Sequence, residues 1–324
     1  MRKVLLTTTA LVAFGGVSAA LALDIGGNYS FDYVINDNGT ANTGGNNNTN
    51  MASDMNIDFT HSATTDAGMT FSVLVRLDES GSIQDQKAGV SGDFGKIELG
   101  ASDGIVDGMD AFYAGSDLPH TGAGTTNSTV NAGSGVADTA TANKISYQTP
   151  VISGFQAGVT HQDAGRTSKA DINSYAITYD FGVAKVGYAS STTGAAAGTS
   201  AETDMKNYGI ASTFGDFGIR FSNGTDTTKN TAGGESSKID TSDWGISYGG
   251  IENVSLYYNG VSSEEKTGTN AGDKMDGTIV GLAYTVAPGV KAKLESGNSD
   301  FTDSSASTGN DQANYTFMSL SVDF

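Results

Sequence analysis

The chain has 324 residues, and its 36 acidic and 17 basic side chains give a formal net charge of −19 and an isoelectric point near 4.2. So acidic a protein has no cationic surface for holding phosphates, which excludes nucleic-acid binding as a function. The absence of cysteine excludes a disulfide framework and a thiolate metal site. With 37 % apolar residues and many aromatic ones, the chain is also too hydrophobic to be a disordered acidic protein.

The first 22 residues are typical of a secretory signal peptide. Arg2 and Lys3 provide positive charge, residues 4–17 are uncharged and mostly apolar, and residues 20–22 (Ala-Leu-Ala) fit an A-x-A cleavage site. A retained membrane anchor is the alternative, but the apolar stretch is short and interrupted by threonine. Cleavage after Ala22 would leave one domain, residues 23–324, with a formal charge of −21.

From residue 23 onward, apolar and polar side chains alternate with a period of two. In residues 23–35, Ile25, Tyr29, Phe31 and Tyr33 share one parity, and polar residues hold the other. Successive side chains of a strand point to opposite faces, so each such segment predicts a strand with one apolar face. The alternation recurs at 54–60, 69–78, 96–101, 144–148, 155–160, 174–179, 184–189, 207–211, 217–222, 243–248, 254–259, 278–286, 290–295 and 318–324, with a weaker strand near 87–91. The sequence therefore predicts about sixteen strands.

The predicted connections are of two kinds that roughly alternate along the chain. The short ones contain Gly, Pro or Asp suited to tight turns and lie at 64–68, 92–95, 150–154, 180–182, 215–216, 249–253 and 287–289. The long ones are polar and low in complexity and lie at 36–53, 103–143, 190–204, 223–241, 262–275 and 298–312. This pattern predicts a closed antiparallel barrel in an outer membrane, with short periplasmic turns and long external loops.

A soluble β-sandwich would also alternate, but its apolar face would be a packed aliphatic core. Here that face is rich in Tyr and Phe near strand ends, where an interfacial girdle places them. Sixteen membrane strands of roughly ten residues each use about half of the mature chain. A barrel of about sixteen strands leaves an aqueous channel, whereas one of about eight is filled by side chains. The sequence therefore favours a membrane barrel with a wet lumen.

Motifs of catalysis are missing from the sequence. The three histidines, His61, His120 and His161, are far apart, and two of them have the apolar parity of strands. Gly95-Lys96 lacks the upstream glycine of a phosphate-binding loop, and no G-x-S-x-G motif occurs. An outer-membrane protease or lipid hydrolase would need a Ser/His/Asp set that these residues do not assemble. We therefore expect a protein that is not an enzyme and needs no cofactor.

Three segments resemble the Gram-negative general porins, and most of all those of the purple-bacterial α-proteobacteria. Residues 143–155 (NKISYQTPVISGF) are similar to the porin strand-turn-strand after the third loop, and residues 89–100 (GVSGDFGKIELG) to the hairpin before it. The chain ends like the sorting signal that the barrel-assembly machinery reads, at Met318, Leu320, Val322 and Phe324. The resemblance implies a homotrimer of sixteen-stranded barrels in outer-membrane lipid. Each barrel would be a passive diffusion channel for small hydrophilic solutes and ions, narrowed by the third loop folded into the lumen.

In this family, acidic residues on the third loop face basic residues on the opposite wall. The matching loop, 103–143, carries Asp103, Asp107, Asp110 and Asp117. The basic residues with lumen parity are Arg76, Lys96, Lys144, Lys185, Arg220, Lys291 and Lys293. Only a few are arginines, which departs from the arginine cluster of many relatives.

The acids of the loop and the charge of the mature chain predict a weak to moderate preference for cations. Acid-rich loops could also hold a structural Ca²⁺, although no EF-hand spacing occurs. The alternative function is a surface adhesin or structural barrel whose lumen is closed. Loop length alone does not separate this alternative from a channel.

Overall fold

The computed structural model describes residues 23–38, 48–101, 103–106, 108–109, 143–163, 171–194, 202–230, 232–304 and 311–324. The predicted signal peptide, residues 1–22, lies outside the described residues. Among those that are described, no helix has the length and apolar character needed to cross a membrane.

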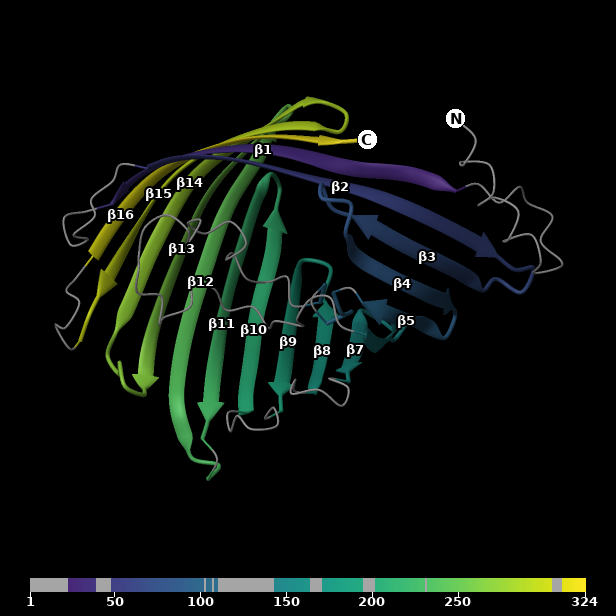
Figure 1. Ribbon diagram of the computed structural model, residues 1–324, viewed down its shortest axis with the longest axis horizontal. Coiled ribbons are helices and arrows are strands. Elements are labelled where there is room, and N and C mark those ends of the chain that lie inside the picture. The colour runs from purple at the N-terminus through teal and green to yellow at the C-terminus, as the bar shows by residue number, and fades with distance from the viewer. Residues whose placement is uncertain are drawn as a thin grey trace.

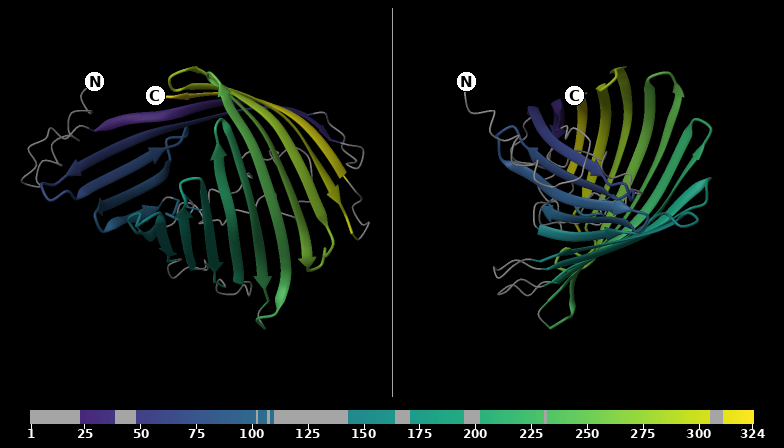
Figure 2. Two further views of the ribbon diagram at one scale, coloured as in Figure 1. Left: turned by 180° about the vertical axis from the view of Figure 1, so that it is seen from behind. Right: turned by 90° about the vertical axis from the view of Figure 1, so that its right-hand side faces the viewer.

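Sixteen antiparallel strands form one closed barrel, which confirms the predicted fold class. Each strand pairs with its neighbours in the chain, and β1 pairs with β16 to close the barrel (Figures 1 and 2). The strands are β1 (Asp24–Asn38), β2 (Asn48–Thr64), β3 (Thr70–Leu77), β4 (Ile83–Gly92), β5 (Gly95–Ala101), β6 (Asn143–Gln148), β7 (Phe155–Gln162), β8 (Ile172–Asp180), β9 (Ala184–Thr193), β10 (Glu202–Phe214), β11 (Phe217–Lys229), β12 (Glu235–Ile251), β13 (Val254–Thr267), β14 (Lys274–Ala287), β15 (Val290–Thr302) and β16 (Asp311–Asp323).

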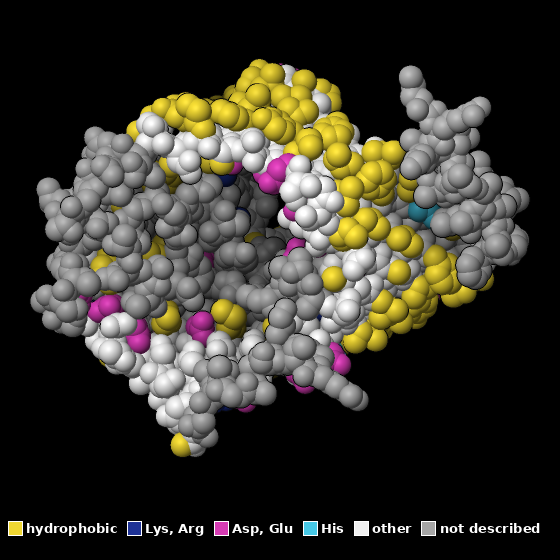
Figure 3. Space-filling view, viewed as in Figure 1, with side chains coloured by type: hydrophobic (Ala, Val, Ile, Leu, Met, Phe, Trp, Pro, Cys, Tyr) yellow, Lys and Arg dark blue, Asp and Glu magenta, His cyan; other side chains and the backbone are white. Residues whose placement is uncertain are grey.

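The two faces of the wall differ as the alternation predicts. Large apolar side chains such as Val280, Ile145 and Phe71 lie on the outer face and remain about half exposed, because no protein covers them. Polar side chains such as Asn207 and Asn259 lie on the inner face and are buried. Figure 3 shows hydrophobic side chains over the outer wall, and acidic side chains around the central hollow. The barrel is thus apolar outside and polar inside, the reverse of a soluble protein.

Aromatic pairs lie on the outer apolar face of the wall. Trp244 and Tyr258 meet edge to face with their ring centroids 5.0 Å apart, and Phe217 and Tyr248 are 4.8 Å apart nearer the short turns. The Trp244 indole lies across Gly260, where an added Cβ would come within 2.6 Å of the ring. Glycine at this position therefore lets the indole lie flat on the wall, where membrane barrels carry their aromatic girdles.

Strands extend well into several segments that the sequence predicted as long loops. β11 and β12 leave only residues 230–234 of the predicted connection 223–241, and β13 and β14 leave only 268–273 of 262–275. In these extensions, polar side chains occupy both faces, so the hydrophobic alternation that marks a strand is lost. Cross-strand hydrogen bonds such as Thr225 Oγ1 to Asp240 Oδ1, at 3.0 Å, support the ladder instead.

Candidate pore and its charged wall

All seven basic residues assigned to the wall lie on the lumen face. The reason is their parity: Lys144 precedes the outward Ile145, and Lys293 precedes the outward Leu294. Side chains paired across neighbouring strands share a face, so the ladder also places their partners in the lumen. The other five are Arg76, Lys96, Lys185, Arg220 and Lys291.

Arg76 on β3 is held between two strands. Its Nε and Nη2 donate to Asp58 of β2 at 2.7 and 2.9 Å, and its Nη1 lies 3.3 Å from Asp85 of β4. Both carboxylates stand directly opposite Arg76 in the ladder. Asp103, at the start of the predicted loop, is near enough to interact with Arg76 electrostatically. The guanidinium is thus fixed in a fork by carboxylates on either side.

On the neighbouring strands β4 and β5, two lysines share one glutamate. Lys96 and Lys87 place their Nζ atoms 2.9 and 3.4 Å from Oε1 of Glu98 on β5. Sequence reasoning missed Lys87, because the strand near 87–91 was predicted from a weak pattern. Extending the alternation back by two residues from Gly89 would have placed Lys87 in the lumen.

Across the lumen, Lys293 of β15 lies 2.7 Å from Glu295, which is almost fully buried. The Tyr257 hydroxyl donates a hydrogen bond to the same carboxylate. The ammonium of Lys293 also lies 5.6 Å from the centre of the Tyr257 ring and 5.9 Å from that of Phe317. Aromatic faces attract a cation, so this lysine is positioned by both charge and rings.

The described beginning of the third loop packs against the inner wall. Ile105, Val106 and Met109 are buried in one cluster with Ala176 of β8 and Ala189 of β9. A Cβ added at Gly158 of β7 would lie 2.6 Å from the Met109 sulfur. Small wall residues thus make room for the start of the loop, and Ile105, Val106 and Met109 lie inside the barrel. Asp107, Asp110 and Asp117 are outside the described residues.

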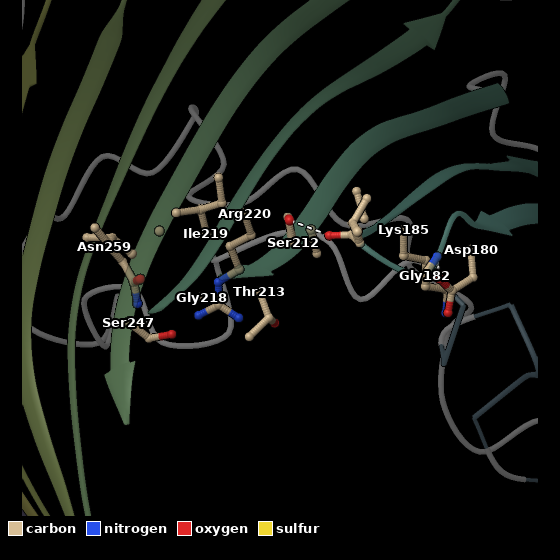
Figure 4. Close-up of a pocket in the computed structure, with 15 residues that line it drawn as sticks. Asp180, Gly182, Lys185, Ser212, Thr213, Gly218, Ile219, Arg220, Ser247 and Asn259 are labelled. Atoms are coloured by element: carbon tan, nitrogen blue, oxygen red, sulfur yellow. Dashed lines mark hydrogen bonds between the residues drawn. The ribbon is translucent and has the colours of Figure 1, made fainter. Parts of the chain in front are cut away.

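A hollow of about 430 Å³ lies in the wall between β9 and β13, near the short turns. Figure 4 shows Lys185, Arg220, Ser247 and Asn259 among its lining side chains. The only acidic residue among those that line it is Asp180. Its Oδ1 accepts a hydrogen bond of 2.6 Å from the backbone of Gly182 in the adjoining turn. The hollow is therefore polar and carries two cations against one carboxylate.

The last strand presents its alternate apolar residues outward. Met318, Leu320 and Phe324 are exposed, and Val322 pairs with Tyr29 and with Val290. The backbones of Phe324 and Gly27 exchange hydrogen bonds of 2.9 and 3.0 Å. Phe324 thus continues the β1–β16 pairing that closes the barrel. Recognition of this segment by the barrel-assembly machinery stays a prediction.

The described histidines sit on the outer face. His161 Nδ1 lies 2.8 Å from Asn173 Oδ1 on β8, and His61 is opposite Val73. His120 is outside the described residues. Within the described residues there is no group of three or more His, Cys, Asp or Glu side chains that could hold a metal ion.

A closed barrel with an apolar exterior, a charged lumen and the start of a loop packed on the inner wall defines an outer-membrane channel protein. The match of residues 7–324 to the family model of Gram-negative porins identifies the family, and the chain belongs to it. Its members are diffusion channels of the outer membrane and are not enzymes. No curated protein sequence gives a significant match.

Solved porins share the fold at low sequence identity. The anion-selective porin from Comamonas acidovorans is 13 % identical, with a TM-score of 0.71 over 94 % of this chain and 100 % of that one. The trimer form of OmpT from Vibrio cholerae is 14 % identical, with a TM-score of 0.71 over 94 % and 100 %. OmpF from Salmonella typhi, in complex with daunomycin, is 15 % identical, with a TM-score of 0.70 over 94 % and 98 %.

Proposed function

We propose that this porin passes small hydrophilic solutes and ions by passive diffusion, with a weak to moderate preference for cations, and that loop 103–143 forms the constriction. The burial of Ile105, Val106 and Met109 on the inner wall carries this proposal. A loop that begins inside the barrel narrows the water-filled path without closing the wall. Sieving by size and filtering by charge then need no catalytic residue.

The charge on the wall supports the preference for cations. Lumen-parity acids on the described strands include Asp32, Asp54, Asp58, Asp85, Glu98, Asp180, Asp226, Asp243, Glu265 and Glu295. Together with Asp103 they outnumber the lumen-parity bases on those strands, which are the seven predicted ones and Lys87. Acidic side chains along a pore raise the local concentration of cations, and salt screens the effect.

Planar-bilayer recordings test both parts of the proposal. We expect single-channel steps from the purified, heat-modifiable protein, and a reversal potential in a KCl gradient that indicates modest K⁺ preference. No conductance from folded protein would contradict a channel and favour the adhesin or structural barrel. A reversal potential of the opposite sign would contradict only the selectivity.

We also propose a homotrimer, as in the trimer form of the Vibrio cholerae protein, and a place among the α-proteobacterial porins. Closures in groups of three in the same recordings would support the trimer, and single independent closures would contradict it.

Cleavage near Ala22 predicts a mature N-terminus at Leu23, which mass spectrometry of the membrane protein checks. Equilibrium dialysis of Ca²⁺ against EDTA-stripped protein tests whether the acid-rich loops bind a structural Ca²⁺.

A further inference from the structure

One ladder row connects the basic residues of the hollow between β9 and β13. Lys185 of β9 stands opposite Ala211, Ala211 opposite Arg220 of β11, Arg220 opposite Gly245, and Gly245 opposite Asn259 of β13. All five have lumen parity. With strands about 4.8 Å apart, the backbones of Lys185 and Arg220 are separated by roughly 10 Å.

Small residues between the long ones create the space. Ala211 separates the two cations, and Gly245 separates Arg220 from Asn259. A Cβ at position 245 would lie 2.9 Å from Arg220 Nε and 2.5 Å from Asn259 Oδ1. The two side chains thus approach each other over the bare glycine backbone. The resulting volume of about 430 Å³ is within the range of pockets that hold small organic molecules.

Asn259 provides an independent sign of a ligand. Its side chain is 1 % exposed, and its Nδ2 has no hydrogen-bond acceptor in the structure. Leaving a buried donor unsatisfied is costly, so such groups usually serve a partner. The missing partner is an acceptor, as the oxygens of an anion would be.

The hollow lies just past the loop, towards the short turns. The described start of the loop packs on Ala176 and Ala189, and each is four residues farther from the short-turn end than Asp180 and Lys185, respectively. A solute that moves from the long-loop end past the loop therefore meets Lys185 and Arg220 next. The lumen faces of the described strands carry more acids than bases, whereas here Lys185 and Arg220 line the hollow with one carboxylate, that of Asp180 opposite Lys185.

We propose that Lys185, Arg220 and Asn259 form a binding subsite for small dianions, dicarboxylates or phosphate, on the exit side of the constriction. The guanidinium and the ammonium bind the two charges, and Asn259 donates to one of the oxygens. The subsite rests on the proposed channel function. It would hold anions that the acid-rich wall disfavours, and so aid their passage.

The test is titration of the open channel with succinate or with phosphate, added on the short-turn side at constant ionic strength. We expect the KCl conductance to fall and to saturate with either anion, whereas acetate gives a much weaker effect. Arg220→Gln and Lys185→Gln should each raise the half-saturating concentration of the dianion at least fivefold. Saturation by succinate alone would assign the site to dicarboxylates, and saturation by phosphate alone would assign it to phosphate.

Two variants separate a shaped site from general charge. Lys291→Gln removes one lumen charge beside another short turn, outside the hollow, and should leave the half-saturating concentration within twofold. Gly245→Ala keeps every charge but displaces Arg220 from Asn259, and should weaken binding as Arg220→Gln does. A linear response to the dianion in the wild type, or equal losses in Lys291→Gln and Arg220→Gln, would overturn the subsite.

The failure of the channel itself is distinguishable from the failure of the subsite. If the folded protein conducts nothing, the proposed function fails. Equilibrium dialysis of succinate and phosphate against the detergent-solubilised, heat-modifiable protein then tests the subsite alone. Weaker binding by Arg220→Gln than by wild type would support it, and equal binding would overturn it.

Discussion

Arg76 and Arg220 both point into the lumen, but their surroundings differ. Arg76 is clasped by Asp58 and Asp85 on the two adjacent strands. Arg220 has Ala211 and Gly245 at the same ladder positions, and a hollow beside it. A cation between carboxylates links adjacent strands through ion pairs, whereas a cation between small residues leaves room for a solute. Cross-strand neighbours, rather than the arginine itself, therefore decide the role of the residue.

The largest effect should come from Arg76→Ala. It would leave Asp58, Asp85 and Asp103 close together without their shared cation. We expect a loss of roughly 1–3 kcal/mol, between the values for exposed and for buried pairs, because these groups are partly exposed. The reversal potential should also move towards stronger cation preference. The temperature of the heat-modifiability transition measures the loss of stability, and bilayer recording measures the reversal potential.

Arg76→Lys is the matched control, since it keeps the charge and loses the forked geometry. It should preserve the reversal potential and lower the transition temperature by less than the alanine variant does. Equal effects of the two variants on selectivity would contradict a role for the charge itself.

The next effect concerns the start of the third loop, which packs on the inner wall. Gly158→Val places methyl groups where Met109 and Ile105 now lie, so the loop start must move off the wall. Overpacking of this kind costs about 1–3 kcal/mol. We expect altered single-channel conductance and faster proteolysis within the loop. Unchanged conductance would mean that the loop start does not control the width of the pore.

A smaller effect is expected for Arg220→Ala. Its ladder neighbours Ala211 and Gly245 are uncharged, whereas those of Arg76 are carboxylates, so the transition temperature should shift by less than in Arg76→Ala. The reversal potential should still move towards cations, since one lumen charge is lost. If Arg220→Ala destabilises the barrel as much as Arg76→Ala does, the contrast between the two arginines is wrong.

The smallest effect should come from the turn after β3. Hydrogen bonds from Ser80 and Ser82 hold the pKa of Asp78 below its ordinary value of 3.8. The native turn therefore favours the charged carboxylate, and this contribution is present above pH 3.8 and lost as the pH falls through the lowered pKa. Asp78→Ala should slightly lower the transition temperature at neutral pH and become indistinguishable from wild type in acid. A difference that grows on acidification would contradict this sign.

Much of the barrel could be predicted because its main signal is local. The alternation places Lys144 and Ile145 on opposite faces whatever the neighbouring strands do, and glycine-rich turns limit most hairpins. The prediction failed where both faces are polar, as in β11 beyond Asn223, since no hydrophobic contrast remains there. The acid partners of Arg76 and Lys96 also have lumen parity, but parity alone does not say which of them meet.

The sequence by itself determined the number of strands, their inner and outer faces, and the family. Only the tertiary structure decided which charges are neighbours, because contact across strands depends on ladder register and on irregularities such as the register shift after Arg76. The row from Lys185 to Asn259 joins residues from five strands, and no spacing along the chain reveals it. Periodicity acts within a strand, whereas the chemistry of the lumen arises between strands.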